Sequence, residues 1–328
     1  MSSHWRRHIY GALLFLVVIA LGLTVGRQRA VRQESPSVLS VAAQSAQVTK
    51  ETPSDDREAN KPSNYPADYF VDQDRSEYQG YTVQRRKRKA LIDTGGDTKN
   101  LWVDVNYVTV KSGTKTVRVF DADIYFGLGN AANFGFFPFL GGDVKQLFIS
   151  QDVPRGGCQW VVSLSPRFKV LFDGRRFSVG REGSELGAED LDNDGIYEIM
   201  ATITDFYEFN DKMSMADIHL PGVIFKYDPS KGTYLPANSK FRDYSLEALM
   251  RVPGVEEEFH HRGAVLSNLL TYIYLGEAEQ GWDTFDESYL LADKEEIRRR
   301  VKTILRRQPV YQLIYHCGKG NRTVACRF

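Results

Sequence analysis

Residues 223–235 read VIFKYDPSKGTYL, and this stretch decides how the middle of the chain is expected to fold. Two short runs of β-branched and aromatic residues, VIFKY and TYL, flank the segment DPSKG. Asp228 and Pro229 are residue types that start turns, and Gly232 can adopt positive φ without a steric penalty. The two runs are therefore expected to pair as a β-hairpin, which places consecutive strands in antiparallel order.

Runs of the same kind recur before this hairpin, with glycine, proline and aspartate turns between them. They are LWVDVNYVTV (101–110), KTVRVFDADIYF (115–126), VKQLFISQ (144–151), CQWVVSL (158–164), FKVLF (168–172) and YEIMATITDFY (197–207). The phenylalanine-rich segment 126–142 is interpreted as a packed, irregular loop. The sequence predicts an antiparallel β-meander within residues 65–240.

Beyond residue 245 the apolar period changes from two to about 3.6, which indicates helices. In GAVLSNLLTYIYL (263–275) one helical face carries Leu266, Leu269, Leu270 and Ile273. Asp293 with Glu296 predicts a capping box that opens a second helix over 294–308, and Pro309 is expected to end it. The runs VYQLIY (310–315) and TVACRF (323–328) are interpreted as a terminal hairpin. Residues 241–328 are thus predicted as a smaller helical subdomain, and the fold class as mainly β with a smaller α part.

Residues 9–26, IYGALLFLVVIALGLTVG, contain no charged residue and follow a short flank, residues 1–8. A helix over this stretch would rise about 27 Å, close to the hydrocarbon thickness of a bilayer. We expect a transmembrane anchor; a cleaved signal peptide is the alternative, but the stretch is long for one and no small-x-small pattern follows it. Residues 27–64 are expected to be a disordered tether, because 33–64 lacks aromatic residues and isoleucine.

The compartment depends on two opposing signals. Arginines lie on both sides of the apolar stretch (Arg6 and Arg7; Arg27, Arg29 and Arg32), so the positive-inside rule alone would allow a cytoplasmic domain. Cys317 and Cys326 bracket a short, turn-rich loop that a disulfide would close; two free thiols in a reducing compartment are the alternative. We expect a single-pass protein of the cell membrane with a periplasmic or extracellular soluble domain.

Residues 189–199 read EDLDNDGIYEI and form the strongest candidate site. Asp190, Asp192, Asp194 and Glu198 offer carboxylate oxygens, Gly195 permits a tight turn, and the backbone carbonyl of Ile196 is the expected further ligand. Calcium takes about six to eight hard oxygen ligands in forgiving geometry, whereas magnesium usually keeps several waters. The stretch predicts a structural Ca²⁺ site; an acidic surface turn without metal is the alternative.

Residues 190–199, DLDNDGIYEI, resemble the calcium loops of FG-GAP and VCBS-type repeats. In these blades of integrin-like β-propellers, Asp-x-Asp-x-Asp-Gly-x-x-Asp/Glu lies between two strands. The resemblance implies ligand roles for Asp190, Asp192, Asp194 and Glu198 and a propeller-like arrangement of strands, although this sequence carries one copy of the loop. Residues 120–240 also look similar to uncharacterised exported bacterial proteins with an isolated loop of this kind, which implies no reaction.

Two further stretches have a functional and a structural interpretation. RGGCQW (155–160) would suit a cysteine nucleophile with Arg155 beside it, but we interpret Cys158 as a small apolar group entering a buried strand. RRKRK (85–89) would suit anionic lipid or nucleic acid, but we interpret it as a solvated edge. His260 and His261 are expected on a solvated first helical turn.

The expected function is a membrane-tethered envelope protein that serves as a calcium-stabilised binding or scaffolding module for a protein or glycan partner. No acid and base pair indicates an enzyme, and the net charge of zero gives no reason to expect a nucleic-acid partner. One alternative is an envelope hydrolase with a pocket between the β and helical parts. The other is a cytoplasm-facing membrane protein that contacts anionic lipid or nucleic acid through the basic run.

Overall fold

The computed structural model describes residues 66–92, 101–121, 131–151, 158–180, 187–209, 211–212 and 220–316. All of them belong to one compact unit that spans Asn60–Phe328. The expected anchor at 9–26, the tether at 27–64 and the cysteine pair Cys317 and Cys326 lie outside the described residues. Among the helices of the described part, none combines the length and the apolar character needed to cross a bilayer.

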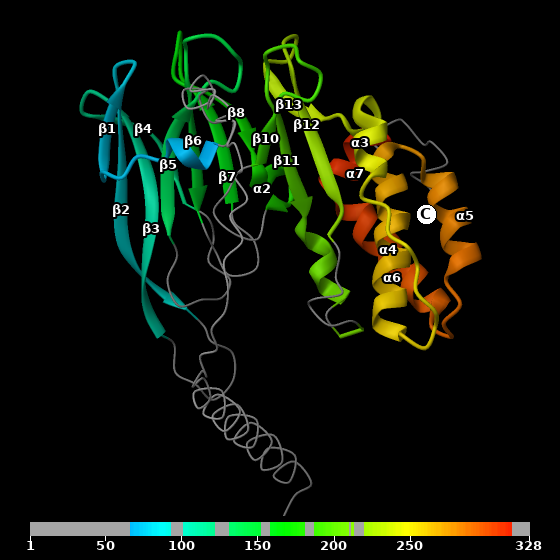
Figure 1. Cartoon of the computed structure of the whole chain (residues 1–328). Coiled ribbons are helices and arrows are strands. Elements are labelled where there is room, and N and C mark those ends of the chain that lie inside the picture. The colour runs from blue at the N-terminus through cyan, green and yellow to red at the C-terminus, as the bar shows by residue number, and fades with distance from the viewer. Residues whose placement is uncertain are drawn as a thin grey trace, which may run out of the picture. The chain divides into compact units, whose positions relative to one another are not determined.

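The described strands form three antiparallel sheets, each made of strands that follow one another in the chain (Figure 1). The first sheet contains β1 (Arg75–Tyr78), β2 (Tyr81–Ile92), β3 (Leu101–Ser112) and β4 (Lys115–Phe120). The second contains β5 (Ala132–Phe137), β6 (Gln146–Gln151), β7 (Cys158–Ser163) and β8 (Lys169–Asp173). The third contains β10 (Gly187–Glu189), β11 (Glu198–Ile203), β12 (Gly222–Asp228) and β13 (Thr233–Pro236), and the short β9 (Val179–Gly180) pairs with β11.

The described part of the chain therefore combines helices with a larger share of strands, and its sheets are antiparallel meanders, as predicted. The hairpin at 223–235 is confirmed as β12 and β13, with Asp228 paired to Thr233. The Asp228 carboxylate accepts the backbone N–H of Ser230 at 2.9 Å, and Gly232 has φ of 60°. Local turn chemistry thus sets the register of this pair.

The prediction of an irregular loop at 126–142 is wrong for residues 132–137, which form β5; residues 126–130 lie outside the described part. Phe134 and Phe137 are buried, as expected for a strand with both faces covered. Gly135 interrupts the run of strand-forming residues in the sequence. A Cβ at this position would lie 2.6 Å from the ring of Phe148 and would also meet the carbonyl oxygen of Tyr69. A strand glycine of this kind marks a close backbone approach.

The second sheet is buried on both faces, because alternate residues of its strands belong to different apolar clusters. Leu147 and Ile149 of β6 pack with Val110 of the first sheet. Phe148, between them in sequence, packs in the cluster that contains Phe225 of the third sheet. The second sheet therefore lies between the other two, which explains why its strands are almost continuously apolar.

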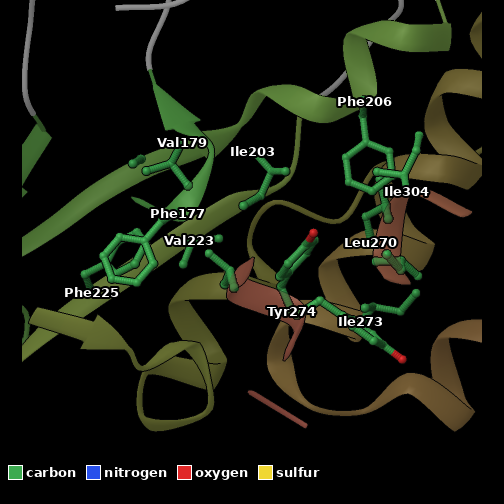
Figure 2. Close-up of a cluster of buried hydrophobic side chains, with 14 of the residues drawn as sticks. Phe177, Val179, Ile203, Phe206, Val223, Phe225, Leu270, Ile273, Tyr274 and Ile304 are labelled. Carbon is green, nitrogen blue, oxygen red and sulfur yellow. The ribbon is translucent and has the colours of Figure 1, made fainter. Parts of the chain in front are cut away.

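Most of the helices occur in the C-terminal part of the chain, and 3-10 turns follow or precede several strands. The helices are α2 (Gly174–Phe177), α3 (Arg242–Leu246), α4 (Glu258–Leu275), α5 (Ala278–Ser288), α6 (Lys294–Arg307) and α7 (Pro309–Ile314), and the 3-10 turns are η2 (Pro66–Tyr69), η3 (Thr204–Phe209) and η4 (Asn238–Phe241). Figure 2 shows how the third sheet meets the helices: Ile203 and Val223 share one apolar cluster with Leu270, Tyr274 and Ile304. Sheet and helices therefore share a continuous core.

Two predictions for the helical part are wrong. The segment 309–314 is the helix α7 and not a hairpin strand, because Pro309 occupies the first turn and the Gln308 side chain accepts the backbone N–H groups of Val310 and Tyr311 at 2.5 and 3.2 Å. The other predicted strand, 323–328, lies outside the described residues. The capping box is also absent at α6, where the Asp293 side chain makes no cap hydrogen bond.

Asp293 instead belongs to a polar cluster around Arg262, a buried residue of α4. Its carboxylate accepts from the Tyr289 hydroxyl at 2.9 Å and from the Arg262 guanidinium at 3.1 Å. Arg262, 2% exposed, also pairs with Glu258 at 2.6 Å. The expectation of solvated histidines is wrong for His261, which is 2% exposed and lies 2.9 Å from the carbonyl oxygen of Pro253, whereas His260 is exposed in the first turn of α4. Tertiary partners outweigh local capping at these positions.

A small set of contacts ties the second sheet to the third at residues 139–141. The carbonyl oxygen of Phe139 accepts the backbone N–H of Tyr197 at 2.9 Å. The buried hydroxyl of Tyr234 lies 3.0 Å from the carbonyl oxygen of Tyr197 and 3.3 Å from that of Phe139. Gly141, with φ of 72°, approaches the carbonyl group of Gly195 closely. The segment after β5 is thus held against the loop before β11.

We expect Gly141→Ala to lower the free energy of unfolding by about 2 to 4 kcal/mol. The added methyl group would meet the carbonyl oxygen of Gly195, and the positive φ strains any residue with a Cβ. Gly142 is the matched control, because its φ is 68° but a Cβ there meets no atom within 4 Å. Gly142→Ala should cost only about 1 kcal/mol. Urea denaturation of both variants measures the difference, and equal losses would contradict the close approach at Gly141.

Candidate metal centre

The acidic loop, residues 190–197, joins β10 to β11 and folds around one carboxylate. The two oxygens of Asp190 accept the backbone N–H groups of Asp194 and Gly195, each at 3.0 Å. An oxygen of Asp194 accepts the N–H of Ile196 at 2.8 Å. Asn193 and Gly195 have positive φ, 56° and 80°, and so turn the chain tightly. The loop therefore presents its aspartates from a fixed backbone.

The carboxylates predicted as metal ligands are brought together. Oxygens of Asp190, Asp192 and Asp194 lie within 4.8 Å of one another. Glu198, the first residue of β11, is fully buried beside them, and one of its oxygens accepts the N–H of Leu191 at 2.9 Å. Ile196 lies in the same loop, where its N–H binds Asp194. The sequence pattern thus correctly indicated a cluster of carboxylate oxygens.

Lys226 of the neighbouring strand β12 reaches into this cluster. Its ammonium nitrogen lies 2.8 Å from a carboxylate oxygen of each of Asp192, Asp194 and Glu198. The Lys226 side chain is only 15% exposed, and its ammonium also lies 5.9 Å from the centre of the Phe241 ring. The ammonium therefore stands at the point on which three carboxylates converge.

The charges of the cluster shift the pKa values of its members. The hydrogen bond from Lys226 holds the pKa of Asp194 below its ordinary value. Burial acts to lower the pKa of Lys226, but its hydrogen bonds to Asp192, Asp194 and Glu198 outweigh burial and raise that pKa above its ordinary value. Both groups are thus charged at neutral pH.

The donor set fits a hard divalent cation. All four acidic side chains offer oxygen, the ligand atom that calcium and magnesium prefer. One ammonium among four carboxylates leaves the cluster with a net negative charge, so a second source of positive charge is favoured electrostatically. Lys226 was missed at the sequence level; its signal is a charged residue inside the apolar strand VIFKY.

Cys158 does not have the surroundings of a nucleophile. It is buried in β7, within the apolar cluster between the first and second sheets. Burial raises the pKa of its thiol to about 12. The thiol is therefore protonated at neutral pH, which removes the reactive thiolate form.

The basic run 85–89 lies on β2, where that strand extends past β1, which pairs with residues 81–84. The Arg85 guanidinium donates to the backbone carbonyls of residues 71–73 at 2.5 to 2.9 Å. Arg88 pairs with Asp121 at 2.8 Å, and Lys89 pairs with Asp104 at 3.2 Å. Several of these basic side chains are therefore already bound to carbonyl or carboxylate groups of the protein itself.

Comparison of the chain with family models, with curated proteins and with solved structures found no match.

We expect Lys226→Met to lower the free energy of unfolding by about 3 kcal/mol in buffer without divalent metal. Removing the ammonium leaves the fully buried Glu198 and its neighbouring aspartates without a compensating charge. Lys231→Met on the same hairpin is the control, because Lys231 is 65% exposed and lies 3.7 Å from Asp228. That change should stay within about 0.5 kcal/mol. Chemical denaturation checks both values.

The stabilisation by Lys226 should also depend on pH in one direction. Because the pKa of Asp194 is lowered in the folded state, its contribution is complete above the ordinary aspartate value, about 3.9, and is lost as pH falls through the lowered value. The difference in stability between the wild type and Lys226→Met should therefore shrink on acidification below about pH 4. If the difference in stability between the two proteins stays constant as pH falls below about 4, over the range in which both remain folded, the result argues against the ion cluster.

Proposed function

We propose that this chain is a single-pass membrane protein of the cell envelope whose folded unit is a calcium-stabilised binding or scaffolding module for a protein or glycan. One observation carries the proposal. Carboxylates of Asp192, Asp194 and Glu198 converge on a single cation position at the base of a strand pair. The loop that supplies them also contacts the second sheet through Gly195 and Tyr197. A cation there would stabilise a junction between sheets.

The three meanders are proposed to be propeller-type blades, with 65–240 as the β domain and 241–328 as a helical subdomain. Each sheet has four consecutive antiparallel strands, apart from the added β9, and the sheets stack through apolar clusters. The acidic loop lies between two adjacent strands of the third sheet, as in the FG-GAP and VCBS-type loops that it resembles. Stacked four-stranded blades are the building unit of propellers.

Calcium is proposed to bind in exchange for the Lys226 ammonium. Asp190, Asp192, Asp194 and Glu198 would hold the ion, together with the carbonyl oxygen of Ile196. Because the ion carries two positive charges and the ammonium one, the exchange would leave less negative charge uncompensated and so stabilise the loop. The ion is proposed to have a structural role. The carboxylates that would hold it accept hydrogen bonds from backbone N–H groups of the loop, and the described residues around them form no pair suited to act as acid and base.

Calcium is expected to raise the melting temperature of the full chain, and a chelator to reverse the rise. Ligands that bind only the folded state stabilise it in proportion to the logarithm of their concentration. Asp192→Ala with Asp194→Ala should lower the melting temperature and abolish the response to calcium. The control is Glu279→Ala with Glu287→Ala, which removes two exposed carboxylates from α5. If the wild-type melt is indifferent to calcium and to chelator, the metal proposal fails.

Lys226→Met sharpens this experiment. Without the competing ammonium, the carboxylates should bind calcium more tightly, so the calcium-dependent rise in melting temperature should exceed that of the wild type. A smaller rise than in the wild type would mean that Lys226 supports the ion rather than competes with it.

The membrane tether is tested by topology reporters fused after residue 328. For an exported domain, a reporter active only outside the cytoplasm should work, and one active only inside should fail. The reverse pattern would favour the cytoplasm-facing alternative and its anionic partners. Deletion of residues 1–26 should release the folded unit from the membrane fraction if 9–26 is the anchor.

A further inference from the structure

A cavity of about 320 Å³ lies between the third sheet and the helices α3 and α4. Met200 and Thr202 of β11 and Ile224 of β12 line it. In β11 these residues alternate with Ile199 and Ala201, which belong to the main apolar core. Ala201 and Val223 of that core also border the cavity, which therefore lies mainly over the outer face of the sheet and reaches the edge of the core.

The cavity wall is neutral. None of the described residues that line it is an acid, a lysine, an arginine or a histidine. The polar side chain of Asn238 is used by the wall itself, since it accepts the N–H of Ile224 at 3.0 Å and donates to the carbonyl oxygen of Gly222 at 3.1 Å. A charged ligand would lose its hydration here without gaining a counter-charge, whereas an apolar ligand would gain by leaving water.

One polar group of the wall has no partner. Ser245 of α3 lines the cavity and is 8% exposed, and its hydroxyl makes no hydrogen bond within the described part of the chain. A buried hydroxyl without a partner is costly, and a serine hydroxyl can rotate to reach an acceptor. Beside it, the ring of Tyr244 is 42% exposed, and its hydroxyl contacts the sulfur of Met200 at 3.2 Å. An aromatic ring thus stands at the rim.

We propose that this cavity is a binding site for a neutral, mainly apolar small molecule with one acceptor oxygen, which receives a hydrogen bond from Ser245. The volume lies at the lower end of ligand pockets, and it is roughly twice that of a cavity known to take up benzene. A two-ring compound or an acyl chain of similar bulk is the matching size. The site is separate from the acidic loop, and its proposal does not depend on calcium binding.

Three naphthalene compounds of similar size separate the contributions. Acetylnaphthalene is neutral and carries an acceptor oxygen, naphthalene lacks the oxygen, and naphthoate carries a negative charge. Binding to the full chain in nonionic detergent is measured by ligand-observed NMR. Partition into detergent is common to all protein variants and cancels when they are compared. After correction for the partition of each compound into detergent, measured without protein, we expect affinity to follow the order acetylnaphthalene, naphthalene, naphthoate.

Ser245→Ala should weaken acetylnaphthalene about five- to tenfold and leave naphthalene unchanged, because only the former accepts the serine hydrogen bond. Ala248→Phe should block both compounds, since Ala248 lines the cavity. Glu247→Phe adds the same ring at the neighbouring exposed position, which does not line the cavity, and should leave both affinities unchanged. Melting temperatures of the variants show whether each remains folded.

The proposal is overturned if acetylnaphthalene binds the wild type no better than it binds Ala248→Phe, or if naphthoate binds as well as acetylnaphthalene. Equal losses of naphthalene and acetylnaphthalene in Ser245→Ala would overturn the assigned hydrogen bond. Because these variants leave the acidic loop intact, their calcium response should match the wild type. Failure here is therefore distinguishable from failure of the calcium proposal.

Discussion

The third sheet depends on one constraint: the carboxylate of Glu198 is fully buried and requires a positive charge beside it. Lys226 supplies that charge from the adjacent strand at 2.8 Å. Ion pairs of this kind contribute modest net stability, because both charges lose hydration, but a mismatch is expensive. Here a mismatch between the two charges would arise from a change in strand register. A slip of one residue between β11 and β12 would turn Lys226 toward the face that carries Val223 and Phe225, within the main core. The pair therefore enforces the register on which the core of this sheet depends.

The constraint extends from the third sheet to the second through the backbone of the acidic loop. Glu198 accepts the N–H of Leu191, so the buried carboxylate also shapes the loop. The residue before it, Tyr197, binds the carbonyl group of Phe139, and Gly195 meets Gly141. Apolar contacts then join the second sheet to the first. Both junctions therefore combine apolar packing with hydrogen bonds, since Phe148 packs in the cluster of Phe225 and Gln151 of the second sheet donates to the carbonyl oxygen of Asn106 in the first at 2.6 Å. The junction with the third sheet differs in the buried ion pair that stands next to it.

Features that depend on near neighbours in the chain were predictable from the sequence. The hairpin at 223–235 follows from its turn residues, and the clustering of Asp190, Asp192 and Asp194 follows from their spacing. Lys226 was not predictable in this way, because it meets Glu198 across 28 positions of sequence. The strand β5 was missed since Gly135 replaces a side chain where Phe148 approaches, and α7 was missed since its residues suit a strand until Gln308 caps it. The long strand β2 was missed because its charged run masks the period-two pattern. Lys226 and β5 thus depend on contacts between distant segments, α7 depends on a local side-chain cap, and β2 depends on pairing with its neighbouring strands.

The outer face of β11 and β12 brings a charged end and an apolar end into one continuous layer. Glu198 and Lys226 occupy the charged end, and Met200 and Ile224 line the cavity at the other. Phe241 joins them, because its ring lies 5.9 Å from the Lys226 ammonium and packs in a cluster with Ile224. Packed side chains transmit displacements to their neighbours, since interiors have little free volume. Any ion that displaces the ammonium would therefore act on a ring that also supports the cavity wall. By thermodynamic linkage, an effect of the ion on a ligand in the cavity would be matched by an equal effect of that ligand on the ion.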